Sequence, residues 1–129
     1  MEYAHIRPVV NQIEIEPYMT QPNVVSYTFR KGIQVEAWGP LGQGVTGVLD
    51  DHAIREIAVC HGKSAAQIVL RWHIQRGLVT IPRCDNDTFT DENISIFDFE
   101  LYPSEMEIIS GLNRNQRAYE QNDPDNFPW

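Results

Sequence analysis

The sequence predicts an α/β protein in which about three parallel strands alternate with helices. Three segments have the β-branched or alternating character of strands: residues 9–15, 33–38 and 78–82. The segments between them carry apolar residues at helical spacing, and helices between successive strands imply parallel pairing. Because three such strands leave exposed sheet edges, we expect the chain to be part of a larger sheet.

The first part of the chain is predicted to form a strand, a helix and a second strand. Residues 9–15 begin with β-branched valines and end with alternating residues. Residues 23–30 carry the helical pattern, with Asn23 as the expected N-cap and Gly32 just past the C-terminus. Residues 33–38 alternate again and form the second expected strand.

A glycine-rich loop and two helices are predicted next. Residues 39–50 contain four glycines and one proline, and long loops in compact domains are often functional. Asp50 or Asp51 is expected to cap a helix that ends before Gly62, and Ser64 is expected to cap the helix after it. The third strand then follows directly.

After the third strand the pattern becomes polar. Residues 83–91 form a polar segment, and Glu92 and Asn93 are expected to open a short turn or helix. Pro103 is placed to start the last helix, because its missing N–H costs nothing in a first helical turn. The remaining residues, 113–129, are expected to form a tail.

Composition excludes several classes of partner and site. The chain has 129 residues, a net charge of −8 and a pI of about 4.8, which argues against a nucleic-acid or anionic membrane surface. The two cysteines, Cys60 and Cys84, lack metal-type spacing and are expected to be reduced thiols. No secretory signal or long apolar run is present, so we expect a cytoplasmic protein without a metal site.

The sequence offers no catalytic motif. Its four histidines are not spaced as metal ligands, and we expect His73 to be a solvated residue on a helix. Neither a nucleophile elbow nor a phosphate-binding glycine motif of the common types occurs. Catalytic sets assemble in space, however, so this absence carries little weight.

Polar and aromatic residues gather where two of the predicted strands end. Asn11 and Gln12 lie in the first strand, and Trp38 ends the second, before the sequence "GPLGQG". Ligands of parallel sheets bind beyond the carboxyl ends of the strands, and exposed backbone N–H groups in a glycine-rich loop suit an anion. Taken alone, the pattern fits a tryptophan that caps a hydrophobic rim better than a binding site.

A second group of this kind follows the third strand. Arg83 comes directly after the strand end and has the fork geometry that suits a phosphate. Glu92 and Asn93 carry groups that can read the edge of an adenine. Taken alone, a surface arginine beside a solvated acidic loop is the better interpretation.

Four blocks of the sequence resemble the aldo-keto reductase family in its own order and spacing: "PVVNQIEIEPY", "VEAWGPLGQG", "AAQIVLRWHIQRGLVTIPR" and "DENISIFDFEL". The resemblance covers residues 6–112, and "WGPLGQG" is most similar to the bacterial branch that includes 2,5-diketo-gluconate reductases. It implies an NADPH-dependent reductase of aldehydes and ketones with an eight-stranded (β/α)8 TIM barrel. The matching blocks correspond to the C-terminal portion of that barrel.

The resemblance assigns ten residues to cofactor binding. Gln12 would bond the nicotinamide carboxamide, and Trp38 would stack on the nicotinamide ring. The pyrophosphate loop would be lined by Gly39, Leu41, Gly42 and Gln43. The adenosine end would be held by Arg83 at the 2′-phosphate, Cys84 beside it, and Glu92 and Asn93 at the adenine.

Two departures from the family pattern bear on the cofactor. Cys84 stands where the family usually has serine, and Phe89 stands where it has a phosphate-binding arginine. A thiol is a weak hydrogen-bond partner and a phenyl ring cannot pair with a phosphate. Losing one charged phosphate contact costs about 1.5–3 kcal/mol, so NADH becomes a plausible cofactor beside NADPH.

The family's catalytic tyrosine, lysine, aspartate and histidine have no matching positions here, so we assign no catalytic residue and expect these 129 residues alone to be inactive. We expect residues 1–112 to form a partial barrel, and 113–129 a loose tail with Phe127 and Trp129 near the substrate. The alternative is a non-catalytic partial barrel that pairs with a separate half or self-associates.

Overall fold

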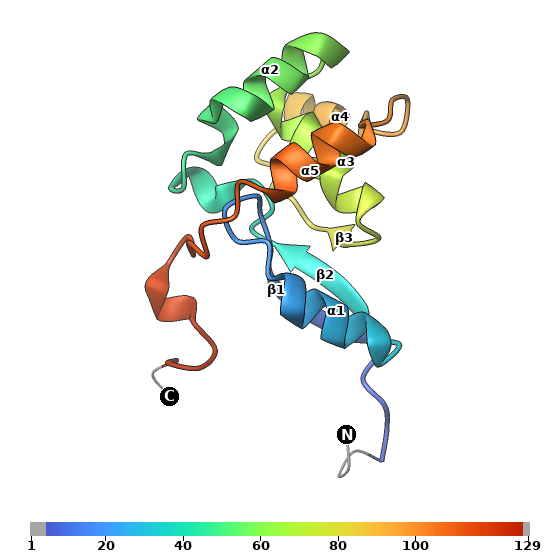
Figure 1. Ribbon diagram of the computed structural model, residues 1–129, viewed down its shortest axis with the longest axis vertical. Helices are drawn as coiled ribbons and strands as arrows, with labels where there is room; N and C mark the ends of the chain where they lie inside the picture. Colours follow the sequence, from blue (N-terminus) through green and yellow to red (C-terminus); the bar gives the residue numbers. More distant parts are fainter. Residues whose placement is uncertain (1–4, 128–129) are drawn as a thin grey trace.

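The computed structural model describes residues 5–127, and its centre is a three-stranded parallel sheet (Figure 1). The strands are β1 (Val10–Glu14), β2 (Gln34–Trp38) and β3 (Val79–Thr80), in that spatial order. The α/β class and the parallel pairing are therefore confirmed. The third strand is shorter than expected, because only Val79 and Thr80 pair with β2.

The register of the sheet decides which side chains share a face. Gln12 lies opposite Glu36, and Glu14 lies opposite Trp38. Side chains alternate along a strand, so these four residues point to the same face of the sheet. On the other face, the Asn11 amide donates to Thr28 Oγ1 of α1 (Pro22–Arg30) at 3.1 Å, so α1 covers that face of β1.

The remaining helices gather beyond the carboxyl ends of the strands (Figure 1). They are α2 (His52–His61), α3 (Ala65–Gln75), α4 (Asp87–Ile94) and α5 (Pro103–Ser110). As predicted, Asp51 caps α2, and Ser64 caps α3 in a reciprocal pair with Gln67. Short 3₁₀ turns at Gly42–Gly44, Val48–Asp50 and Glu120–Asn122 shape the loops.

The core lies between the sheet and the helices α2, α3 and α5. Trp72 of α3 is fully buried, and its indole N–H donates to Ser110 Oγ of α5 at 3.0 Å. Ile54 of α2 and Ile109 of α5 are buried in the same cluster as Val35 of β2. Burying these side chains contributes about 1.5–3 kcal/mol each and sets the position of the strand ends relative to the helices.

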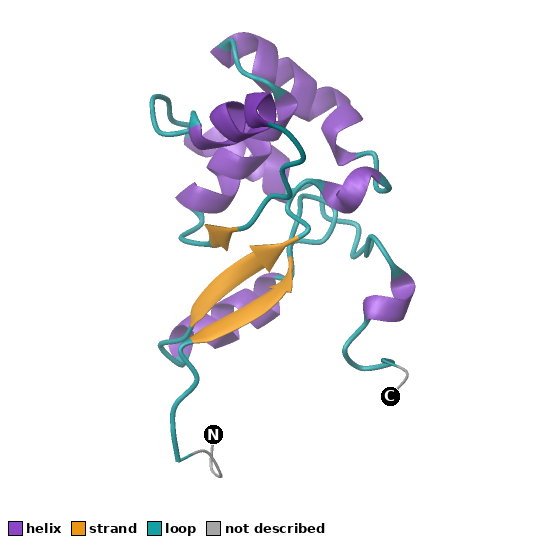
Figure 2. Cartoon of the chain, turned by 180° about the vertical axis from the view of Figure 1, so that it is seen from behind, coloured by secondary structure: helices purple, strands orange, loops and turns teal. Residues whose placement is uncertain are grey.

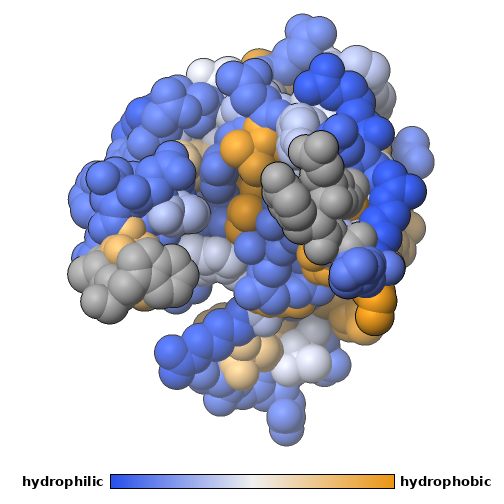
Figure 3. Space-filling view, turned by 90° about the horizontal axis from the view of Figure 1, so that it is seen from below, coloured by the Kyte–Doolittle hydropathy of each residue, from blue (hydrophilic) through white to orange (hydrophobic). Residues whose placement is uncertain are grey.

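Within residues 5–127, no α-helix covers the other face of the sheet, and the tail covers it only at Glu14. We call it the open face: it consists of the alternate residues Val10, Gln12, Glu14, Gln34, Glu36, Trp38 and Val79. In Figure 2 the helix behind the strands leaves their near face exposed, and Figure 3 shows hydrophobic side chains in a hollow of the molecule's lower side. Val10, Val79 and the following Ile81 are 47%, 42% and 43% exposed.

Two sequence expectations, on the cap of α1 and on the exposure of His73, are wrong. Asn23 does not cap α1, because the helix starts at Pro22 and its N-cap is Gln21, in a left-handed conformation. His73 is not solvated: its side chain is fully buried, with Nδ1 2.7 Å from the Val69 carbonyl oxygen and Nε2 2.9 Å from that of Ile15. Burial lowers the pKa of His73 to about 4.

Backbone hydrogen bonds tie the tail to the turn that follows β1. The N–H groups of Arg114 and Gln116 both donate to the Tyr18 carbonyl oxygen at 3.0 Å. The Arg114 guanidinium also lies 3.7 Å above the Tyr18 ring. The division between residues 1–112 and 113–129 stays a prediction, and Trp129 lies outside the described residues.

Candidate functional site

A cavity of about 340 Å³ lies beside the exposed edge of β1 and brings Gln12 and Trp38 together. Its other walls include Glu14 of β1 and the tail residues Arg117 and Asn122. The Gln12 amide donates to Glu36 Oε1 at 2.6 Å, and this bond fixes the position of the amide. The structure thus places an aromatic ring at the end of β2 and an amide in the middle of β1, on the same face of the sheet.

Glu14 is a member of this site that the sequence reasoning missed. Its side chain is buried, accepts the Ala118 N–H at 2.6 Å and lies 3.7 Å from the Arg117 guanidinium. A buried carboxylate needs such partners, because an unpaired charge is costly away from water. The alternation that places Gln12 and Glu14 on one face of β1 was the signal that could have identified it.

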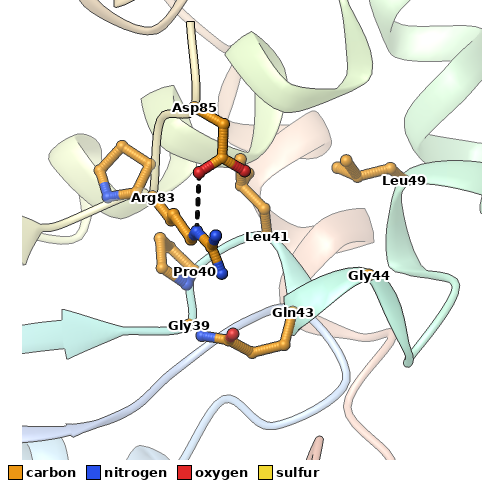
Figure 4. Close-up of a pocket in the computed structure, with 9 residues that line it drawn as sticks. Gly39, Pro40, Leu41, Gln43, Gly44, Leu49, Arg83 and Asp85 are labelled. Atoms are coloured by element: carbon orange, nitrogen blue, oxygen red, sulfur yellow. Dashed lines mark hydrogen bonds and ion pairs between the residues drawn. The ribbon is translucent and has the colours of Figure 1, made fainter. Parts of the chain in front are cut away.

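The glycine-rich loop lines a second cavity, of about 310 Å³, beside Arg83 (Figure 4). Gly39, Leu41 and Gln43 all line it, whereas Gly42 of the same loop is buried and does not. A Cβ at Gly42 would lie 2.0 Å from Thr46 Oγ1, and the backbone φ there is +75°. Only glycine fits that position without displacing the loop.

A third cavity, of about 410 Å³, lies between this loop, the start of α3 and α4. Arg83, Glu92 and Asn93 line it together with Phe89. Glu92 and Asn93 lie near the end of α4 instead of opening a helix as expected, and the Glu92 carboxylate accepts a hydrogen bond from the Ser64 hydroxyl. The second and third cavities adjoin, since Leu41, Leu49, Arg83 and Asp85 line both.

The Cys84 side chain lies apart from the two cavities that Arg83 lines. Its thiol is 3.1 Å from the Asn86 carbonyl oxygen and 3.0 Å from Thr90 Oγ1. It lines a separate, largely apolar cavity of about 310 Å³ between α3, β3 and α4, to which Asn93 also contributes. The structure therefore does not bring the Cys84 side chain to the cavities of Arg83.

A buried acid lies beneath the glycine-rich loop. Glu16 is fully buried and accepts the Tyr18 N–H at 3.0 Å, and burial raises its pKa to about 7. The nearby Glu14 raises this pKa further, while the Tyr18 N–H and Arg114 lower it. Glu16 Oε1 and Thr46 Oγ1 are both buried without a hydrogen-bond partner among the described residues.

Residues 5–127 show no group of three or more histidine, cysteine or acidic side chains that could hold a metal ion. Within the same residues, no helix has the length and apolar character needed to cross a membrane. Cys60 and Cys84 are both free and exposed.

Comparison with known proteins places the whole arrangement in one family. A model described as "Aldo/keto reductase family" matches residues 1–114. Among curated proteins, the chain is 45% identical over all its residues to an uncharacterized oxidoreductase, YtbE, of Bacillus subtilis, and covers 45% of that protein. It is 46% identical over 89% of its length to the glyoxal reductase of the same bacterium, covering 41% of it.

Solved structures give the same result. The aldo-keto reductase AKR2E4 of Bombyx mori, solved in complex with NADP, superposes with a TM-score of 0.87 at 37% identity, over 98% of this chain and 44% of that one. The D53A mutant of Gox0644, in complex with NADPH, superposes with a TM-score of 0.84 at 38% identity, over 88% and 41%. The chain thus spans less than half the length of these relatives.

Proposed function

Because the chain belongs to the aldo/keto reductase family, we propose that it supplies the cofactor-binding part of an oxidoreductase. The reaction is hydride transfer from a nicotinamide cofactor to an aldehyde or ketone, in the cytoplasm. The observation that carries the proposal is the order of the cavities. Gln12 and Trp38 line the first cavity, and Gly39, which directly follows Trp38 in the chain, lines the second. The second cavity adjoins the third at Arg83.

Each part of this path suits one part of a dinucleotide. The half-buried Trp38 offers a plane for the nicotinamide ring, and the Gln12 amide is placed to bond its carboxamide. The glycine-rich loop presents backbone N–H groups to the pyrophosphate. Arg83 and the residues of α4 would bind the adenosine. The candidate cofactors are NADPH and NADH.

We propose that these 129 residues bind cofactor without catalysing turnover. The family's proton donor, a tyrosine with a lysine, an aspartate and a histidine, has no counterpart at a matching position here. A positioned general acid contributes roughly 10²–10⁴ in rate. Without one, the carbonyl oxygen receives no proton in the transition state.

The test is to titrate the chain with NADPH and NADH while following the fluorescence of the reduced nicotinamide. We expect saturable binding, and Trp38→Ala is expected to weaken it at least about tenfold through loss of the ring contact. Tyr27→Ala is the matched control, because Tyr27 is an aromatic residue of α1 that is 55% exposed and lines none of these cavities. Absence of saturable binding would contradict the proposal.

Turnover is measured on the same sample with a panel of carbonyl compounds. Glyoxal and methylglyoxal belong in the panel, because relatives of this chain are named as reductases of these compounds. We expect no oxidation of NADPH or NADH above background. Turnover that persists after contaminating reductases are removed would show that a proton donor exists within these residues.

A second candidate function rests on the open face. Its exposed valines and the unpaired edges of β1 and β3 suit cover by further βα units. We propose as the alternative a non-catalytic partial barrel, which either pairs with a separate half or self-associates. The mass of the chain in solution tests this alternative.

A further inference from the structure

The adenosine end of the candidate site has an unusual charge balance for a site that is to hold a phosphate. Of the described residues that line the second and third cavities, Arg83 is the one basic side chain, while Asp85 and Glu92 are acidic. The lining therefore carries a formal charge of −1, from one cation and two anions. A phosphate dianion would enter a site that is already negative.

Arg83 is also engaged by the nearer of the two acids. Its Nε donates to Asp85 Oδ1 at 2.9 Å. Figure 4 shows the guanidinium between the Asp85 carboxylate and the loop that carries Gly39, Pro40 and Gln43. The two side chains are 80% and 68% exposed, so the pair contributes little to the stability of the fold. The pair matters because it occupies a hydrogen-bonding group of Arg83 that a phosphate would otherwise use.

No second positive charge compensates for this pairing. Phe89 lines the same cavity with a phenyl ring, which is 52% exposed. The Cys84 thiol faces the other cavity, against Asn86 and Thr90. A 2′-phosphate would have to displace Asp85 from Arg83 and then remain beside its carboxylate.

A ribose without that phosphate would interact favourably with the Asp85 carboxylate. Its 2′- and 3′-hydroxyl groups are hydrogen-bond donors, and a carboxylate is the acceptor that recognises them in dinucleotide sites. Asp85 lines both cavities, so it is within the region where the ribose of a bound dinucleotide would lie.

We propose that Asp85 determines the cofactor by accepting the ribose hydroxyls, and that the site selects NADH over NADPH. The assignment rests on the proposed function, because it presumes that the cavities hold a nicotinamide dinucleotide. Arg83 then serves to orient the Asp85 carboxylate. In this role it replaces the phosphate contact that the family resemblance implies.

The test is calorimetric titration of the chain with NADH and with NADPH, for the natural sequence and for Asp85→Asn. We expect the natural chain to bind NADH about tenfold more tightly or better. Asp85→Asn keeps the size of the side chain, removes the charge and frees Arg83. It is expected to lower the NADH preference about tenfold, by gaining NADPH affinity and losing NADH affinity.

Two further variants sharpen the test. Asp87→Asn is the matched control: Asp87 lies in the exposed first turn of α4, lines none of the cavities, and its removal changes the net charge equally. We expect Asp87→Asn to leave the preference unchanged. Adding Phe89→Arg to Asp85→Asn is expected to invert the preference toward NADPH.

The failures of the two proposals are distinguishable. Binding of neither cofactor would overturn the proposed function and the role of Asp85 together. A natural chain that binds NADPH more tightly, or an unchanged preference in Asp85→Asn, would overturn the role of Asp85 alone. An equal effect of Asp87→Asn would also overturn it, since the effect would then come from net charge.

Discussion

Among single residues, Glu16 is expected to govern how the stability of the protein varies with pH. Its pKa is raised from 4.5 to about 7 by burial, so the folded protein holds a proton that the unfolded chain releases. The folded state is therefore favoured most below pH 4.5, and this contribution is lost as the pH rises through about 7. The full loss amounts to about 3 kcal/mol.

Glu16→Gln is expected to remove this dependence, because the amide keeps an acceptor for the Tyr18 N–H and does not ionise. At pH 8 the variant should be more stable than the natural chain by up to about 3 kcal/mol, and at pH 4.5 the two should be equal. Urea unfolding at both pH values measures this. Glu56→Gln, at a carboxyl group that is 69% exposed, is the control and should behave like the natural chain.

His73 acts in the opposite direction, so the variants must be compared at each pH. Its pKa is lowered from 6.5 to about 4, and its contribution is present above pH 6.5 and lost as the pH falls toward 4. Between about pH 4.5 and 6.5 the two contributions oppose each other. The natural chain can therefore have a free energy of unfolding that hardly changes in that range. The proposed effect of Glu16 then requires that the free energy of unfolding of Glu16→Gln rises with pH.

Among the elements, the start of α2 depends on one aspartate that serves three partners. Asp51 accepts the Ala53 N–H at 3.0 Å and the Tyr18 hydroxyl at 2.7 Å, and it lies 3.7 Å from Arg114. Asp51→Ala should cost about 2–4 kcal/mol, from the lost cap and the lost charged hydrogen bond.

Urea unfolding followed by circular dichroism measures the cost of Asp51→Ala. Asp50→Ala is the matched control, because Asp50 is 75% exposed and pairs only at the surface with Arg55. It should change stability by less than about 0.5 kcal/mol. Equal losses in the two variants would show that the three contacts of Asp51 contribute no stability.

The elements also show where sequence patterns suffice. The caps at Asp51 and Ser64 were predictable, since a capping side chain acts on backbone groups within a few residues. The cap of α1 and the burial of His73 were not predictable in this way. They depend on a left-handed Gln21 and on packing around every side of α3, and neither is encoded by the spacing of apolar residues.

For the whole molecule, the open face predicts association. Exposed valines and two unpaired strand edges form a surface that favours pairing with another chain. We expect light scattering to give a mass above the 14.8 kDa of one chain, increasing with concentration. A strictly monomeric chain that melts cooperatively would contradict this.

The variant that tests the surface is Val79→Lys, because a charge on an edge strand opposes strand pairing. It should shift the mass toward that of one chain. Val59→Lys is the control: Val59 is 81% exposed on α2, remote from the sheet, and should leave the mass unchanged.

For the whole molecule, sequence patterns single out some residues of the candidate site, and they do not show which distant segments contact one another. Trp38 and Arg83 follow from the rule that ligands meet the carboxyl ends of parallel strands, whereas Gln12 lies in the middle of β1. The contact of Glu14 with Ala118 does not follow from this rule, because the two residues are 104 positions apart. Nor could the sequence alone show that the Cys84 side chain lines a different cavity from Arg83.

The hydrogen bond between Glu14 and Ala118 also links the position of the tail to the charge of the cavity. Any movement that lifts the tail from the strand ends separates Arg117 and the Ala118 N–H from the Glu14 carboxylate. The opened state then presents an uncompensated negative charge to the cavity of Trp38, and water must enter to solvate it. The tail therefore supplies both partners of the Glu14 carboxylate at this cavity.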